Sequence, residues 1–164
     1  MPDFKPIPSV AGEVRFRHPD EVPYGPLSNY YPCSIRLDGL SYPSAEHAFQ
    51  CLKAARREVA EWLAAAPDAF LAASAGDSLP ETEIVPGWME RRADLMRPVL
   101  RAKFTQHAHL RKLLLSTGSA ELVEWASQDN EVNRFWSKFN GVGENVLGKL
   151  LMELREELRA QSDS

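Results

Sequence analysis

Basic residues are outnumbered in this sequence, where 19 lysines and arginines face 23 acidic residues and leave a net charge of −4 at pH 7. A protein that holds a long nucleic acid needs a basic face that neutralises backbone phosphates. The charge balance therefore argues against long nucleic-acid tracts as partners. Recognition of one nucleotide, or of a single modified base, stays open.

Cysteine is also scarce. The two cysteines, Cys33 and Cys51, show neither CxxC spacing nor a disulfide framework, which favours a reducing compartment. No apolar run approaches the roughly 18 residues needed to span a bilayer. The first ten residues lack the apolar segment of a signal peptide. These features predict a cytoplasmic protein with no membrane partner, and no zinc spacing, P-loop or GxSxG elbow is present.

The remaining pattern is that of one domain with short strands and several helices. Residues 1–11 hold three prolines and are expected to form a flexible arm. Alternation around Val14 and Phe16 predicts a strand, and Asp38-Gly39 predicts a type I′ turn between two more strands. Ser44 is placed to cap a helix that continues to about Arg57. Leucines at helical spacing from 147 to 158 predict the last helix.

The segment YPSAEHAFQCLK carries a line of polar residues on its expected helix. Glu46, Gln50, Lys53 and Arg57 are four, three and four residues apart and fall within a band of roughly 60°. Two interpretations are open. The pattern alone favours a solvated face with helix-stabilising pairs. The alternative is a partly buried site in which Glu46 and Lys53 tune each other's pKa.

Two further segments have both a structural and a functional interpretation. The glycine-rich stretch 140–148 precedes the last helix, where a helix N-terminus favours a phosphate, or it is a turn with close packing at Gly148. In the loop 24–31, Asn29 could bind a base edge or a sugar, or adopt positive φ in a tight turn. Trp88 and Trp136 could stack on a heterocycle, although tryptophan is more often a core residue.

Taken together, these segments resemble the NADAR superfamily of YbiA-like N-glycosidases. The matching stretches are YGPLSNYYPCSIRLDGLSYPSAEHAFQCLKA, LRAKFTQHAHLRKLLLSTGSAELVEW and GVGENVLGKLLMELREEL. The resemblance implies an α+β fold over residues 12–160, a mainly α-helical single domain with a small antiparallel β-sheet. It also implies hydrolysis of an N-glycosidic bond in ribosylamino-pyrimidine phosphates of the early riboflavin pathway, without a metal or organic cofactor.

The resemblance also assigns roles to individual residues. Lys53 would be a nucleophile that forms a Schiff base, provided that desolvation lowers its pKa. Glu46 would move the proton or stabilise the cation, and Asn29 would orient the ribose or base. The remaining substrate-binding positions are a stacking Trp88, a phosphate-receiving turn with Gly143 and Asn145, and Trp136.

Several positions depart from the family pattern. Asn133 and Ser137 replace the acid and the glycine of a D-x-x-W-G motif, in which Asp129 is a nearby substitute. Asp77 follows Gly76 where an arginine is expected, and Gly87 replaces an acid before Trp88. The departures leave two alternatives: a glycohydrolase acting on ADP-ribosylated guanine in nucleic acid, or a non-enzymatic sensor of ADP-ribose-like nucleotides.

Overall fold

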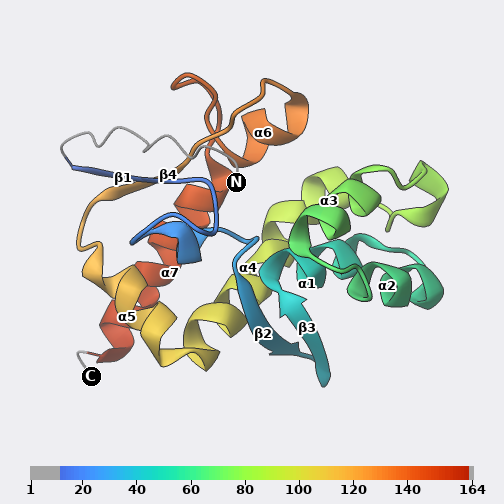
Figure 1. The fold of residues 1–164 in the computed structure, drawn as a ribbon, viewed down its shortest axis with the longest axis horizontal. Helices are drawn as coiled ribbons and strands as arrows, with labels where there is room; N and C mark the ends of the chain where they lie inside the picture. The colour runs from blue at the N-terminus through green and yellow to red at the C-terminus, as the bar shows by residue number, and fades with distance from the viewer. Residues whose placement is uncertain (1–11, 163–164) are drawn as a thin grey trace. The chain divides into compact units, whose positions relative to one another are not determined.

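The computed structural model describes residues 12–162, so the flexible arm expected at 1–11 lies outside the described residues. The chain divides into two compact units (Figure 1). Unit one holds residues 12–28 and 108–162, and unit two holds Asn29–His107. The organisation of residues 12–160 as one domain stays a prediction. The mainly helical α+β class with small sheets is confirmed.

Unit two contains a β-hairpin followed by helices. Its elements are β2 (Pro32–Leu37), β3 (Leu40–Ser44), α1 (Ala45–Lys53), α2 (Arg57–Ala64), α3 (Ala69–Asp77), the 3-10 helix η2 (Glu81–Glu83) and α4 (Trp88–Gln106). The expected hairpin is present, and β2 and β3 pair antiparallel with Ile35 opposite Tyr42. Asp38 and Gly39 have φ of 52° and 82°, the positive values that a type I′ turn requires.

Helix α1 begins where the sequence predicts. The Ser44 hydroxyl accepts a hydrogen bond from the backbone N–H of His47 at 3.1 Å, as a helix cap does. The His47 ring lies with Nδ1 2.7 Å from Ser44 Oγ and Nε2 3.0 Å from Ala66 O. Because a carbonyl only accepts, Nε2 carries the hydrogen in this arrangement and Nδ1 accepts from the Ser44 hydroxyl. His47 thus fixes the start of α1 against the residues that follow α2.

Helix α1 ends at Lys53, earlier than the expected Arg57, which is instead the first residue of α2. Ala54 leaves the helix with extended backbone angles and forms an antiparallel bridge with Ile84. The backbone N–H of Val85 donates to Lys53 O at 2.9 Å. This tertiary pairing stops the helix, although the sequence after Lys53 remains helix-prone.

Helix α1 packs against α2, α3 and α4 inside unit two. Its apolar face buries Ala45, Ala48 and Phe49. In α4, Pro98 does not break the helix, which runs continuously from Trp88 to Gln106. Three neighbouring helices therefore surround the segment that carries the polar line.

Unit one contains the second sheet and the last helix. Its elements are β1 (Glu13–Phe16), the 3-10 helix η1 (Gly25–Leu27), α5 (Ala108–Ser116), β4 (Glu121–Glu124), α6 (Glu131–Trp136) and α7 (Val146–Ser162). β1 and β4 pair in parallel, with Val14 opposite Leu122. The strand around Val14 and Phe16 was expected, but hydrophobic alternation carries no information on strand direction.

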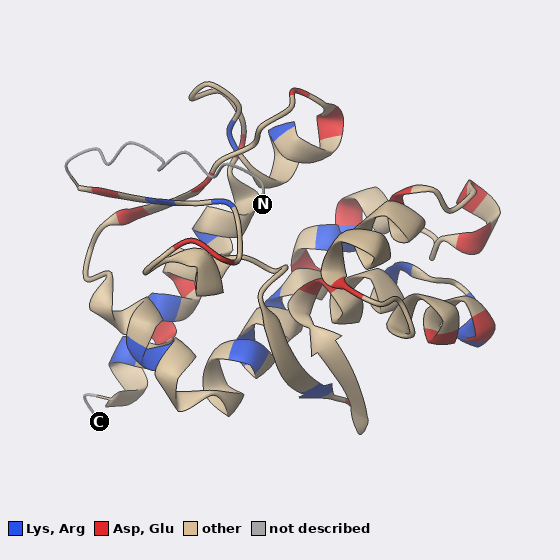
Figure 2. Cartoon of the chain, viewed as in Figure 1, with Lys and Arg blue, Asp and Glu red and all other residues tan. Residues whose placement is uncertain are grey.

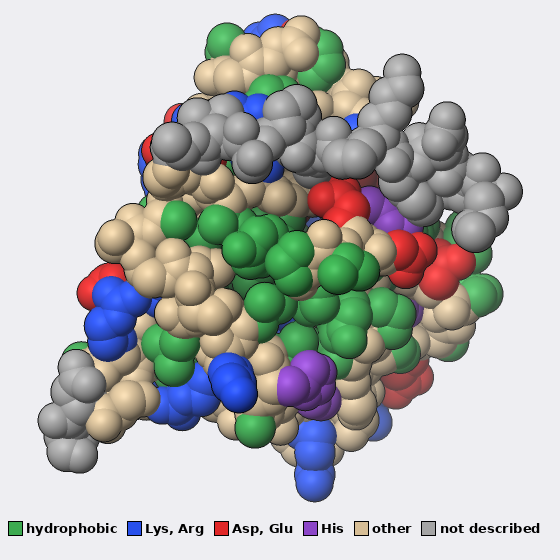
Figure 3. Space-filling model, turned by 60° about the vertical axis from the view of Figure 1, so that its left-hand side comes forward, with side chains coloured by type: hydrophobic (Ala, Val, Ile, Leu, Met, Phe, Trp, Pro, Cys, Tyr) green, Lys and Arg blue, Asp and Glu red, His purple; other side chains and the backbone are tan. Residues whose placement is uncertain are grey.

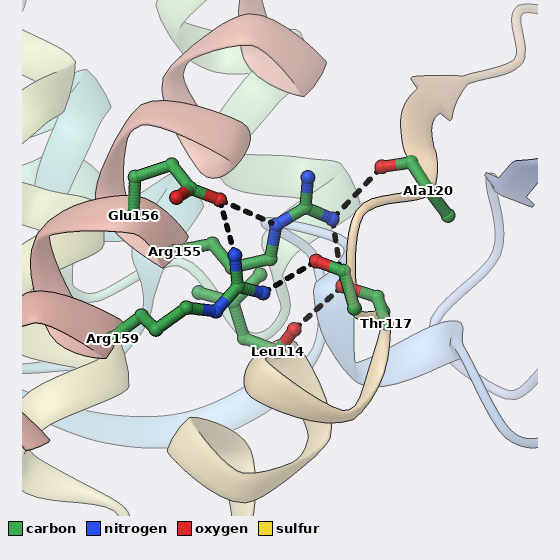
Figure 4. A network of polar contacts seen from close by, with 7 residues as sticks. Leu114, Thr117, Ala120, Arg155, Glu156 and Arg159 are labelled. Atoms are coloured by element: carbon green, nitrogen blue, oxygen red, sulfur yellow. Dashed lines mark hydrogen bonds and ion pairs between the residues drawn. The ribbon is translucent and has the colours of Figure 1, made fainter. Parts of the chain in front are cut away.

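A buried arginine joins α7 to the turn between α5 and β4 (Figure 4). Arg155 is 4% exposed, and its Nη1 donates to Thr117 Oγ1 at 2.9 Å and to Ala120 O at 2.8 Å. Thr117 Oγ1 in turn donates to Leu114 O at 2.6 Å, and Arg159 Nη2 donates to Gly118 O at 2.5 Å. The two arginines thereby donate to carbonyl groups of the turn that follows α5.

The beginning of α7 lies against β4. A Cβ atom on Gly148 would stand only 2.0 Å from Leu122 O, so the backbone of α7 approaches β4 as closely as glycine allows. The expectation of close packing at Gly148 is confirmed.

The surface mixes side chains of different kinds. Figure 2 shows lysine and arginine interspersed with aspartate and glutamate along the helices. Figure 3 shows hydrophobic side chains at the surface beside basic and acidic ones. Within residues 12–162, no helix combines the length and the apolar character that crossing a membrane requires.

The Gly148 contact generates a stability prediction. We expect Gly148→Ala to lower the free energy of unfolding by about 1–3 kcal/mol, because the new methyl group must push α7 away from a backbone carbonyl. Urea denaturation measures the change. The exposed neighbour provides the control, since Lys149→Ala should stay within about 0.5 kcal/mol of the unmodified protein. Equal stability of the two variants would contradict the packing argument.

Candidate active site

The polar line of α1 is buried. Glu46, Gln50 and Lys53 are 8%, 3% and 8% exposed. The interpretation as a solvated face is therefore wrong, and Arg57 does not belong to the line because it lies on α2. Buried polar and charged groups are costly unless they find partners, so the contacts of these three side chains define what the site can do.

Gln50 holds the carboxylate of Glu46. Its Nε2 donates to Glu46 Oε1 at 2.8 Å. A carboxylate offers only acceptors, so this contact fixes the orientation of the Gln50 amide. The amide oxygen, Gln50 Oε1, consequently faces away from Glu46, and it is buried without a hydrogen-bond partner. The backbone N–H of Glu46 donates to Asn29 O at 3.0 Å, which fixes the first turn of α1 as well.

The amine of Lys53 is held at the end of helix α3. Lys53 Nζ donates to Gly76 O at 2.8 Å and lies 3.8 Å from Asp77 Oδ1. The C-terminal end of a helix carries partial negative charge, which attracts a cation. The ring of Trp88, the first residue of α4, has its centroid 5.6 Å from the same nitrogen. We call Glu46, Gln50, Lys53, Asp77 and Trp88 the Lys53 cluster.

Gly76 allows α3 to approach this closely. A Cβ atom on Gly76 would lie 1.9 Å from Gln50 Oε1, so the Gln50 amide occupies the space that a side chain would need. The same residue presents its carbonyl to Lys53. Gly76 therefore contacts two members of the polar line, one through its Cα and one through its oxygen.

Burial and charge act in opposite directions on the lysine. Burial lowers the pKa of Lys53, while the carboxylates of Asp77 and Glu46 oppose this shift. Burial raises the pKa of Asp77, and the Lys53 cation opposes that shift. The proton affinities of the two groups therefore move toward each other. A lysine with a depressed pKa supplies more neutral amine near pH 7 and is a better nucleophile.

Two predicted binding residues lie in unit two with the Lys53 cluster. Trp88 follows Gly87, which has φ of 73°, and its ring packs against Phe49 with centroids 5.0 Å apart. Asn29 is 5% exposed and does not have positive φ, so the tight-turn interpretation of Asn29 is wrong. Its Nδ2 contacts Met96 Sδ at 3.5 Å, and its Oδ1 is buried without a hydrogen-bond partner. Buried acceptors without a partner are uncommon in folded proteins.

The predicted phosphate turn belongs to unit one. Asn145 is 1% exposed, and both ends of its side-chain amide are used within that unit, because Oδ1 accepts from Glu124 N at 3.1 Å and Nδ2 donates to Leu122 O at 2.9 Å. A Cβ atom on Gly143 would lie 2.2 Å from Ser137 O. These contacts give both residues a structural task, and their contacts with substrate stay a prediction.

Two of the residues that depart from the family pattern, Asn133 and Ser137, also lie in unit one. Ser137 Oγ donates to the Glu124 carboxylate, and Asn133 Nδ2 donates to Gln128 O at 2.8 Å. Asp129 is paired with Arg134 through two contacts of 2.6 and 2.8 Å, so its carboxylate already has a strong partner. The ring of Trp136 meets that of Phe135 edge-on, with centroids 4.8 Å apart. A role for Trp136 in binding substrate stays a prediction.

The sequence did not predict that Gly76 and Asp77 lie beside Lys53. Asp77 appeared only as a departure from the family pattern, because 23 residues separate Gly76 from Lys53 and no periodicity connects them. Only the packing of α3 on α1 places the two together.

The fold and these contacts define a class of protein: a small α+β protein with a buried lysine amine flanked by carboxylates, which suits nucleophilic and acid–base chemistry. The chain belongs to the NADAR domain family, which matches residues 15–159.

Similarity to individual proteins supports the assignment to this family. The chain is 40% identical over 136 residues to the N-glycosidase YbiA of Shigella boydii, a match that covers 82% of each chain. It is 37% identical over 147 residues to a riboflavin biosynthesis protein of Vibrio vulnificus, covering 89% of this chain and 38% of that protein. The NMR structure of Escherichia coli YbiA superposes with a TM-score of 0.79 at 37% identity, covering 91% of this chain and 86% of that one.

The burial of Lys53 generates a titration prediction. We expect its amine to titrate below the ordinary value of 10.5, because the loss of hydration outweighs the two carboxylates. NMR of the protein with ¹³C-methylated lysines measures this, and the Lys53 resonance is assigned by its loss in Lys53→Arg. A midpoint at or above 10.5 would show that burial does not dominate the pKa of Lys53.

Proposed function

We propose that this protein hydrolyses the N-glycosidic bond of a phosphorylated ribosylamine, with Lys53 as the nucleophile. The class of the enzyme, an N-glycosidase among the hydrolases, follows from its similarity to YbiA. The relative named for riboflavin biosynthesis supports an early riboflavin-pathway ribosylamino-pyrimidine phosphate as the substrate. Both cysteines are free thiols, which supports a cytoplasmic place for this reaction.

The observation that carries the proposal is the position of the Lys53 amine. It is buried, lies 2.8 Å from a helix-terminal carbonyl, and has a carboxylate at 3.8 Å. A solvated lysine would hold its proton and remain a surface cation. In this setting a neutral amine can still donate one N–H to Gly76 O, because its lone pair takes no part in that hydrogen bond.

The reaction proceeds in two stages. In the first, the Lys53 lone pair attacks C1′ of the ribosyl group, and the bond from C1′ to the nitrogen of the base breaks. The departing nitrogen keeps the bonding electrons, and the Glu46 carboxylate carries to it one of the two protons on the attacking Lys53 nitrogen. The lone pair of the Lys53 nitrogen then forms a second bond to C1′, while the ring oxygen leaves with its bonding electrons and takes a proton from solvent, so that a protonated Schiff base joins C1′ to Lys53. In the second stage, water adds to C1′ and releases the sugar and the lysine.

The neighbours of Lys53 support these stages. The hydrogen bond from Gln50 fixes the Glu46 carboxylate on the buried line of α1, two helical turns before Lys53. The exposed part of the Trp88 ring offers a surface on which a pyrimidine can stack. The unsatisfied oxygen of Asn29 can accept a hydrogen bond from a ribose hydroxyl or a base N–H.

Covalent trapping tests the proposal. We expect borohydride added during turnover of a ribosylamino-pyrimidine phosphate to fix the sugar on Lys53, which mass spectrometry of the Lys53 peptide detects. We expect Lys53→Ala to lose turnover by at least about 1,000-fold, because the covalent route is removed. The exposed Lys112→Ala serves as the matched control and should retain activity.

Retention of turnover in Lys53→Ala would contradict a mechanism in which Lys53 is the nucleophile. The same trapping with an ADP-ribosylated guanine nucleotide separates the two substrate classes. Tight binding of such nucleotides without release of any base would instead favour the sensor alternative.

A further inference from the structure

The end of helix α3 places a second carboxylate beside the nucleophile. We propose that Asp77 is a catalytic residue of this enzyme: it accepts the proton that Lys53 must lose before its amine can attack, and it passes that proton to solvent. The inference rests on the proposed function of Lys53, and it assigns a separate task to a residue 24 positions further along the chain.

The geometry suits a proton acceptor. Asp77 Oδ1 lies 3.8 Å from Lys53 Nζ, within reach of a direct contact after a small side-chain rotation or of a relay through one water. Asp77 is the last residue of α3, where few helical contacts restrain its side chain. The Gly76 carbonyl holds the lysine nitrogen at 2.8 Å, so the amine stays in place while the carboxylate moves.

The exposure of the two carboxylates near Lys53 divides their tasks. Glu46 is 8% exposed, and Gln50 holds it. The side chain of Asp77 is 50% exposed, so its carboxylate can contact the lysine and solvent at once. A group that exchanges protons with water needs such access. Asp77 is therefore the outlet for the proton, whereas Glu46 acts on the bound substrate.

The step balances as a single proton transfer. One N–H bond of the Lys53 ammonium breaks, and its electron pair remains on Nζ as the nucleophilic lone pair. One O–H bond forms on Asp77, which becomes a neutral carboxylic acid and then releases the proton to water. Burial lowers the pKa of Lys53 and raises that of Asp77, so the transfer is less uphill than between the same groups in water.

The charged groups whose fields act on Lys53 lie on two helices. Asp77 on α3 and Glu46 on α1 both favour the ammonium form. From α4, the Trp88 ring is the group that faces the lysine nitrogen. If Asp77 only stabilised the ammonium, its neutralisation would lower the pKa of Lys53 and speed the reaction near pH 7. A proton acceptor predicts the opposite sign.

Ribose 5-phosphate is a suitable probe, because its open form carries an aldehyde at C1 that reacts with an amine without any base having to leave. We expect Asp77→Asn to form the cyanoborohydride-reduced adduct on Lys53 at least about 10-fold more slowly than the unmodified protein at pH 7. The deficit should close near pH 10, where hydroxide removes the proton directly. Asp77→Glu should recover most of the rate, because it retains a carboxylate.

Glu81→Gln is the matched control, since it removes one exposed negative charge from the segment that follows α3 and should leave the rate unchanged. An Asp77→Asn rate at pH 7 equal to or faster than that of the unmodified protein overturns the proposal, and so does a deficit that persists unchanged at pH 10. Lack of any Lys53 adduct in the unmodified protein at every pH overturns the nucleophile as well. If an adduct forms with ribose 5-phosphate but ribosylamines are not turned over, the proposed substrate is wrong. The rates of adduct formation still test the role of Asp77 in that case.

Discussion

The contact between Lys53 Nζ and Gly76 O is the interaction on which the arrangement of unit two depends. It joins the last residue of α1 to the last turn of α3 at 2.8 Å inside a buried region, where an ammonium group without a partner would be costly. The carbonyl provides a partner and still leaves the amine usable, because it does not transfer a proton. A buried ion pair at hydrogen-bond distance would hold the lysine in its charged form more firmly.

The sequence predicts much of α1 and little of what surrounds it. Glu46, Gln50 and Lys53 fall on one line because a helix repeats every 3.6 residues, and Ser44 caps the helix as its side chain suggests. The end of α1 was misplaced because the bridge from Ala54 to Ile84 overrides local propensity. Such a contact between distant segments leaves no periodic trace in the sequence.

The same limit applies to the site. The pattern on α1 favoured a solvated face, and only the resemblance to a family favoured a site there. Burial of the three side chains supplies the physical reason, since it comes from packing against three other helices. In the sequence, Asp77 appeared only as an unexpected residue in the family pattern. Its proximity to Lys53 could not be deduced without the fold. At Asn29 the sequence left a tight turn and a buried contact both open, because asparagine in a loop suits either.

Helix α1 is fastened at both ends, by the His47 ring to Ala66 O and by Lys53 O to the backbone of Val85. The Cα of Lys53 therefore has little freedom to shift. Whatever distance separates the amine from a bound sugar must be covered by rotation about the side-chain bonds of one lysine. Rotations of this kind need no rearrangement of the backbone. The reach of the lysine stem thus sets how far from α1 the reacting carbon can lie.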